Sequence, residues 1–224
     1  MTGVRSFYRT SIGKKTVMAV TGLIGVGFVT GHMIGNLQVY LGAETLNAYA
    51  KFLKSSMELL WAIRVVLLAA VVTHVVAAVQ LTIENRKARP QRYAYQKPIQ
   101  ASFASRTLRW GGIILLLFII YHILHFTVGV APGGPSDFSK TNVYNNVIYG
   151  FRNIWVSLFY IAAMLALGMH IYHGAWSLFQ SLGLNNARWS RVLRRVATVL
   201  GIALFVGNIS IPLMVLAGVL QPQP

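Results

Sequence analysis

The stretch that decides the fold is 109–130, which reads RWGGIILLLFIIYHILHFTVGV. Its only charged residue is Arg109 at the first position, and its polar residues include two histidines, His122 and His125. A helix needs about 20 mainly apolar residues to cross a hydrocarbon core about 30 Å thick. The stretch meets this length and composition, so it predicts a transmembrane helix.

Four other stretches share this character, at residues 16–38, 59–83, 153–179 and 196–220. The 224-residue chain is 55% hydrophobic and 11% charged, with a mean hydropathy of +0.58, which is typical of membrane proteins. The first stretch is too long for a signal peptide, and no small-residue cleavage site follows it. We therefore predict an all-α integral membrane protein, a single membrane domain over 1–224 with a bundle of five transmembrane helices.

Two features of the composition restrict the function. The chain has no cysteine, which excludes disulfides and thiolate-ligated iron–sulfur clusters within it. Its formal net charge is +16, from 20 Lys and Arg against 4 acidic residues. A nucleic-acid-binding face would interleave such residues with aromatics, whereas here they cluster between apolar stretches. We expect a membrane protein with no nucleic-acid partner.

The basic clusters predict the orientation of the chain. They are Arg5, Arg9, Lys14, Lys15, Arg86, Lys87, Arg89, Arg92, Lys97, Arg106, Arg188, Arg191, Arg194 and Arg195. Because cytoplasmic loops are enriched in Lys and Arg, the N-terminus and the loops 84–106 and 185–195 are expected in the cytoplasm. Segments 42–56 and 131–152 and the C-terminus are then outside. Segment 42–56 has apolar residues at helical spacing, which predicts a short interfacial helix.

All the histidines fall inside the predicted spans. They are His32, His74, His122, His125, His170 and His173. Ionisable residues are normally rare in membrane spans, so this concentration needs a cause. One interpretation is hydrogen bonding between helices, worth about 1 kcal/mol per contact. The other is ligation of a cofactor.

Depth in the membrane distinguishes the two interpretations. At a rise of about 1.5 Å per residue, His32 lies about 24 Å and His122 about 20 Å from the cytoplasmic ends of their helices. His74 and His170 each lie about 14 Å from those ends. We name His32 with His122 the outer pair, and His74 with His170 the inner pair.

Two pairs at two levels are what two stacked porphyrins require, because bis-imidazole ligation places one histidine on each face of the ring. A zinc site would instead gather three or four ligands at one level. We therefore expect two b-type haems with saturated iron, whose chemistry is one-electron transfer. On spacing alone, His125 and His173 remain alternative ligands, since each lies three residues after a member of a pair.

Glycines lie near the histidines of the first and fourth predicted spans. They are Gly27, Gly31, Gly35, Gly168 and Gly174. A porphyrin needs small residues where its ring approaches a helix. The same spacing is also typical of close packing between helices, so both interpretations stay open.

Several motifs together resemble a known family. They are SIGKKTVMAVTG at 11–22, HMIGNLQ at 32–38, NRKARP at 85–90 and HIYHGAWS at 170–177. This combination, spread over nearly the whole chain, resembles the bacterial five-helix, di-haem cytochrome b subunit of succinate dehydrogenase or fumarate reductase. The resemblance implies that His32 and His122 ligate the outer haem iron and that His74 and His170 ligate the inner one. It implies a bacterial cytoplasmic membrane as the location.

The resemblance also implies partners. They are a flavoprotein that interconverts succinate and fumarate, an iron–sulfur subunit docked on the cytoplasmic basic loops, and a membrane quinone, with menaquinone favoured over ubiquinone. Anionic lipid attraction explains the same basic charges. The chain itself would be the electron-transferring and quinone-reactive subunit and would not act on succinate.

Three residues near the outer end of the second span have two interpretations each. Arg64 would pair with an outer-haem propionate or extend to the lipid headgroups. Glu58 and Trp61 would border a quinone pocket or form an interfacial anchor.

Two other functions compete. One is the di-haem cytochrome b anchor of another oxidoreductase, of the formate dehydrogenase or hydrogenase type. The other is a haem-free transporter that relays protons through its histidines.

Overall fold

The computed structural model describes residues 2–88 and 103–223. The basic positions Arg89, Arg92 and Lys97, discussed above, lie outside the described residues. The described helices follow in this order: α1 (Thr2–Arg9), α2 (Ser11–Asn36), the 3-10 segment η1 (Leu37–Leu41), α3 (Ala43–Lys54), α4 (Met57–Lys87), α5 (Phe103–Ile123), the π-helical segment η2 (Leu124–Val128), α6 (Val143–Arg152), α7 (Ile154–Ser181) and α8 (Ser190–Leu216).

Five helices in the described part of the chain are long and apolar enough to cross a membrane. They are Ser11–Leu41, Met57–Lys87, Arg106–Val128, Ile154–Ser181 and Ser190–Leu216. The predicted fold class, an all-α bundle with five membrane spans, is therefore confirmed.

The ends of the spans differ from the predicted ones for local reasons. The first begins at Ser11 rather than residue 16, because the Thr10 hydroxyl caps the helix by accepting from the Gly13 N–H at 2.9 Å. The last ends at Leu216 rather than residue 220, and Gly218 follows with a φ of 72°. A glycine in this left-handed conformation is a common helix terminator.

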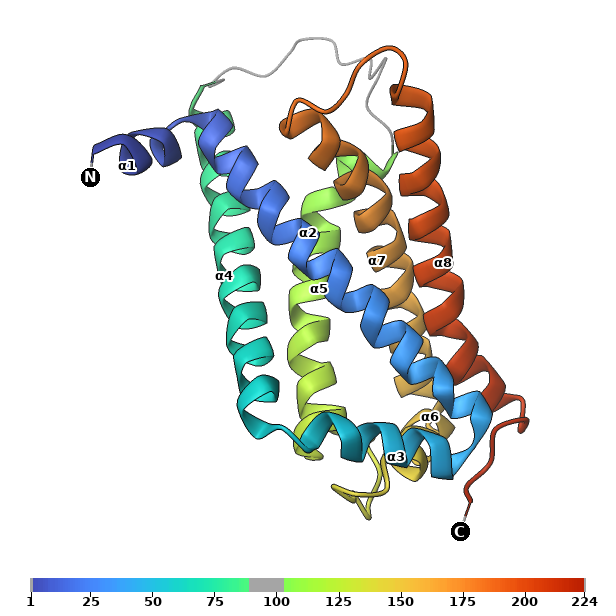
Figure 1. The fold of residues 1–224 in the computed structure, drawn as a ribbon. Coiled ribbons are helices and arrows are strands. Elements are labelled where there is room, and N and C mark those ends of the chain that lie inside the picture. The colour runs from blue at the N-terminus through green and yellow to red at the C-terminus, as the bar shows by residue number, and fades with distance from the viewer. Residues whose placement is uncertain (1, 89–102, 224) are drawn as a thin grey trace.

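Different elements lie at the two ends of the bundle (Figure 1). One end, which we call the basic end, holds the start of α2, the end of α4 and the turn between α7 and α8. At the opposite end, which we call the capped end, α3 and α6 lie across the long helices. The N-terminus lies at the basic end and the C-terminus at the capped end. α3 matches the short helix predicted within 42–56.

α7 lies at the centre of the packing. It contacts α2, α5 and α8, whereas α4 packs mainly against α2. The α7–α8 contact is close, since a Cβ on Gly201 would lie 2.8 Å from the backbone oxygen of Gly168. Of the two interpretations of Gly168, the structure supports helix packing.

The core at the capped end contains a helix that the sequence reasoning did not predict. α6 begins where the Asn142 side chain accepts from the Asn145 N–H at 3.1 Å. It buries Tyr144 and Ile148, and the Tyr144 hydroxyl donates to the Gln221 backbone oxygen at 3.0 Å. These contacts attach the C-terminal segment to the capped end.

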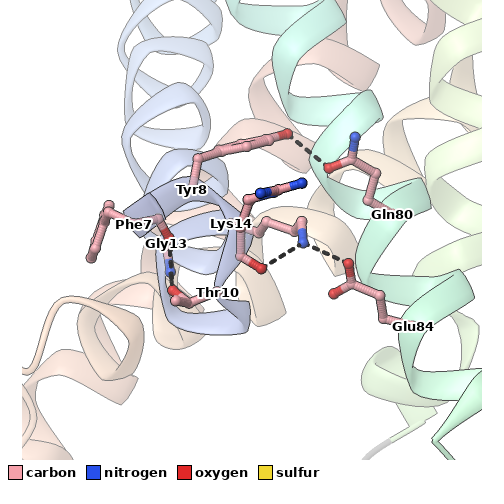
Figure 2. Close-up of polar contacts among 8 residues, drawn as sticks. Phe7, Tyr8, Thr10, Gly13, Lys14, Gln80 and Glu84 are labelled. Carbon is pink, nitrogen blue, oxygen red and sulfur yellow. Dashed lines mark hydrogen bonds and ion pairs between the residues drawn. The ribbon is translucent and has the colours of Figure 1, made fainter. Parts of the chain in front are cut away.

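An ion pair and hydrogen bonds, which we call the polar latch, join the N-terminal segment to α4 at the basic end (Figure 2). The Lys14 ammonium lies 2.5 Å from the Glu84 carboxylate and also donates to the Arg9 backbone oxygen at 3.3 Å. The Tyr8 hydroxyl donates to Gln80 Oε1 at 2.9 Å. Lys14 is buried, so it depends on these partners to offset its lost hydration.

We expect Glu84→Gln to destabilise the protein by about 1–2 kcal/mol, because the buried Lys14 ammonium loses its counter-charge. The Glu84 carboxylate is partly exposed to solvent, which keeps the loss of stability below that for a fully buried ion pair. The measurement is the thermal unfolding midpoint in detergent. Glu58→Gln, an exposed glutamate with no ion pair among the described residues, is the matched control. Equal midpoints for the two variants would contradict the expected role of the latch.

Candidate functional site

The inner pair joins α4 and α7. The rings of His74 and His170 have centroids 6.3 Å apart and planes tilted by 55°. Thr21 on α2 approaches the same place, with its hydroxyl oxygen 3.1 Å from His74 Nδ1. Three helices therefore meet at this level.

The outer pair joins α2 and α5. The rings of His32 and His122 have centroids 5.6 Å apart and lie perpendicular to each other. Phe28 stacks on His32 with a centroid distance of 5.4 Å and an interplanar angle of 15°. Tyr160 on α7 places its hydroxyl 3.2 Å from His122 Nδ1. The sequence-derived partners thus face each other at both levels.

His125 occupies a separate, closed position. Its side chain is fully buried, and its Nδ1 lies 2.9 Å from the Tyr160 hydroxyl. Two glycines enclose the ring, since a Cβ on Gly150 would lie 2.8 Å from His125 Nε2 and one on Gly134 would lie 3.0 Å from Cδ2. The helix changes from α to π geometry at Leu124, between His122 and His125, and such turns are frequent at functional sites. The ring that faces His32 belongs to His122.

The ring spacing within each pair is compatible with one shared metal. Two imidazoles that bind a metal from opposite sides, through bonds of about 2 Å, have ring centroids about 6 Å apart. The observed 5.6 Å and 6.3 Å are close to this value. Among the described residues, His170 Nδ1 is also buried without a hydrogen-bond partner, as is His125 Nε2.

Three glycines near the paired histidines have open space at the Cβ position, and an apolar recess lies near the outer pair. A Cβ built on Gly27, Gly31 or Gly174 would meet no heavy atom of the described residues within 4 Å, so packing between the described helices does not explain these glycines. An open apolar recess of about 360 Å³ lies between α2 and α4. It is lined by Ile24, Phe28, Ala62, Ile63, Val66 and Leu67. Since Phe28 also stacks on His32, the recess borders the outer pair.

The remaining candidate residues lie at the margins of these pairs. His173 is half-buried on α7, three residues beyond His170. Arg64 is exposed near the start of α4, with its guanidinium 5.1 Å from the centre of the Trp61 ring. This stacked pair and the exposed Glu58 lie where an interfacial anchor is expected.

The histidines form pairs rather than larger groups. Within residues 2–88 and 103–223, no group of three or more His, Cys, Asp or Glu side chains is placed to hold a metal ion. A pair of neutral imidazoles suits an iron whose four other ligands come from a porphyrin. The donor chemistry of each pair therefore suits such a group.

The sequence reasoning missed Thr21 and Tyr160. Each bonds the Nδ1 of one paired histidine from a neighbouring helix. Hydroxyl residues are common in membrane helices, and only the register between helices identifies these two. The available sequence signal for such residues was a hydroxyl side chain at about the same depth as a histidine on another predicted span.

The fold and the site together define a multi-pass helical membrane protein with two facing histidine pairs. Residues 82–209 match the family model of the succinate dehydrogenase/fumarate reductase transmembrane subunit. This match covers more than half of the chain, so the chain belongs to that family, as the motifs predicted. No curated protein and no solved structure matched the chain. As a membrane subunit of such a complex, the chain works with catalytic partner subunits.

Proposed function

We propose that this subunit is a di-haem cytochrome b that passes electrons between an iron–sulfur partner subunit and membrane quinone. His32 and His122 would hold the outer haem, and His74 and His170 the inner one. The observation that carries the proposal is the facing of two histidine pairs, with centroids 5.6 Å and 6.3 Å apart, inside a member of this family.

The two pairs lie at distinct levels along the bundle. On α7, Tyr160 of the outer level and His170 of the inner level are ten residues apart, or about 15 Å. Haems held by these histidine pairs would supply one-electron transfer. The apolar side chains around the recess would exclude water from the outer site.

His122 is the proposed ligand on α5, and His125 is not. The ring of His122 faces His32, whereas His125 is enclosed by Gly134 and Gly150. On α7, His170 faces His74, so His170 is the proposed ligand in preference to His173.

The basic end is the proposed docking face for the iron–sulfur subunit, which in turn contacts the flavoprotein. By the distribution of Lys and Arg, this end and the N-terminus lie in the cytoplasm, and the capped end and C-terminus lie outside a bacterial cytoplasmic membrane. The inner pair is then nearer the docking face. The family resemblance favours menaquinone as the quinone.

The test uses the complex purified through a tag on this chain. A flavin-containing partner active on succinate should co-purify, and succinate should reduce a b-type absorption band in the complex. Formate and hydrogen serve as control donors. Reduction by either of these, together with no response to succinate, would contradict the proposal and support the other class of di-haem anchor.

A further inference from the structure

Helices α2 and α7 each contribute to both levels. α2 carries His32 of the outer pair and also Thr21, which contacts His74 of the inner pair. α7 carries His170 of the inner pair and also Tyr160, which contacts His122 of the outer pair. The two helices pack against each other. Each therefore supplies a histidine at one level and a hydroxyl at the other.

The hydrogen bonds of Thr21 favour one tautomer of His74. A hydroxyl has one proton to donate, and Thr21 donates it to the Val17 backbone oxygen at 2.8 Å. Toward His74 Nδ1, 3.1 Å away, the Thr21 oxygen is then an acceptor. This arrangement places the His74 proton on Nδ1 and leaves the lone pair on Nε2 for a metal.

Tyr160 lies between two histidine nitrogens and has one proton for both. Its hydroxyl is 3.2 Å from His122 Nδ1 and 2.9 Å from His125 Nδ1. If Tyr160 donates to His125, it accepts from His122, and His122 Nε2 is free to bind iron. If Tyr160 donates to His122, the proton of His122 lies on Nε2 and blocks ligation. Only the first arrangement is compatible with iron.

We propose that Thr21 and Tyr160 are positioning residues that each hold one haem-ligating histidine in its iron-binding tautomer, and that His125 is the acceptor that keeps Tyr160 in the required orientation. This inference rests on the proposed function. It assigns Thr21 to the inner site only and Tyr160 to the outer site only.

The proposal has a consequence for the reduction potentials. An acceptor on Nδ1–H raises the basicity of an imidazole ligand, and a more basic ligand favours ferric iron. Removing the acceptor should therefore raise the potential of the haem concerned. The potential of the other haem should stay unchanged, because its own acceptor is on the other helix.

The test is a redox titration of the b-type absorption in the purified complex. Tyr160→Phe should shift one of two reduction steps upward, and that step should be the one missing in His122→Ala. Thr21→Val should shift the other step upward, the one missing in His74→Ala. Thr21→Ser, which keeps the hydroxyl, should restore the original value.

Matched controls separate positioning from general packing. Tyr121→Phe removes a hydroxyl in the same aromatic cluster that donates to the Pro132 backbone oxygen. Thr30→Val removes one on α2 that donates to Val26. Each of these control variants should leave the two haem reduction steps at their wild-type potentials. Shifts in the controls equal to those in the test variants would overturn the proposal.

The failure of this inference is distinguishable from failure of the proposed function. Two haem steps that stay in place in both test variants would overturn the inference alone, whereas a wild-type complex without haem would overturn both. If Tyr160→Phe keeps only the inner haem while the Tyr121→Phe control keeps both haems, the assignment of Tyr160 to the outer site is supported. Loss of the inner haem from that chain would overturn it.

Discussion

Replacing His122 with alanine is expected to lower the haem content of the purified subunit from about two haems per chain to about one, because the outer site loses one of its two axial ligands. The remaining haem should be the inner one, between His74 and His170. Its reduction step should match that of the wild type. The measurement is haem per chain combined with a redox titration of the reduced band.

His125→Ala is the matched comparison, because it removes a histidine three residues away on the same helix. His125 is enclosed by Gly134 and Gly150 and contacts Tyr160, not His32. This variant removes the acceptor of the Tyr160 hydroxyl, so the outer reduction step is expected to shift, but it should keep about two haems per chain because both outer ligands remain. The reverse outcome, in which His125→Ala loses a haem and His122→Ala does not, would show that the ligand on α5 is His125.

His74→Ala and His170→Ala are expected to have the second large effect, loss of the inner haem with the outer one retained. Because both rings belong to one pair, the two variants should have the same spectrum and the same surviving reduction step. Succinate should then reduce the outer haem much more slowly, since the inner haem is the one nearer the proposed docking face.

His173→Ala controls for a histidine change near the basic end of α7. It should keep both haems. Different surviving steps in His74→Ala and His170→Ala would show that these histidines do not share an iron.

The sequence predicts the membrane spans well because hydrophobic length is a property of each segment by itself. The span 109–130 needs no information from the rest of the chain. α6 was missed for the opposite reason. Its stability depends on burial of Tyr144 and Ile148 against the rest of the capped end, and its start depends on the Asn142 cap, so tertiary contacts outweigh its short local pattern.

The histidine levels could be predicted because rise per residue converts sequence position into depth. The rotation of each helix about its own axis could not be predicted, and this rotation determines which histidine ring faces inward. His122 and His125 have nearly the same depth, and the π-helical turn that starts at Leu124 has no evident sequence signal. The same limit applies to Thr21 and Tyr160, whose roles depend on which helices are neighbours.

The glycines show the same distinction between spacing and environment. Gly168 and Gly31 both lie near paired histidines, and spacing gave each two interpretations. In the structure Gly168 contacts α8, whereas a Cβ on Gly31 would meet nothing within 4 Å. Only the neighbouring helices distinguish a packing glycine from one beside open space.

The most direct test of the account is the dithionite-reduced visible spectrum of the purified subunit, with haem and protein quantified in the same sample. The account predicts a b-type band and about two haems per chain, held by two histidine pairs. A preparation without a b-type band, from cells supplied with ample haem, would contradict it.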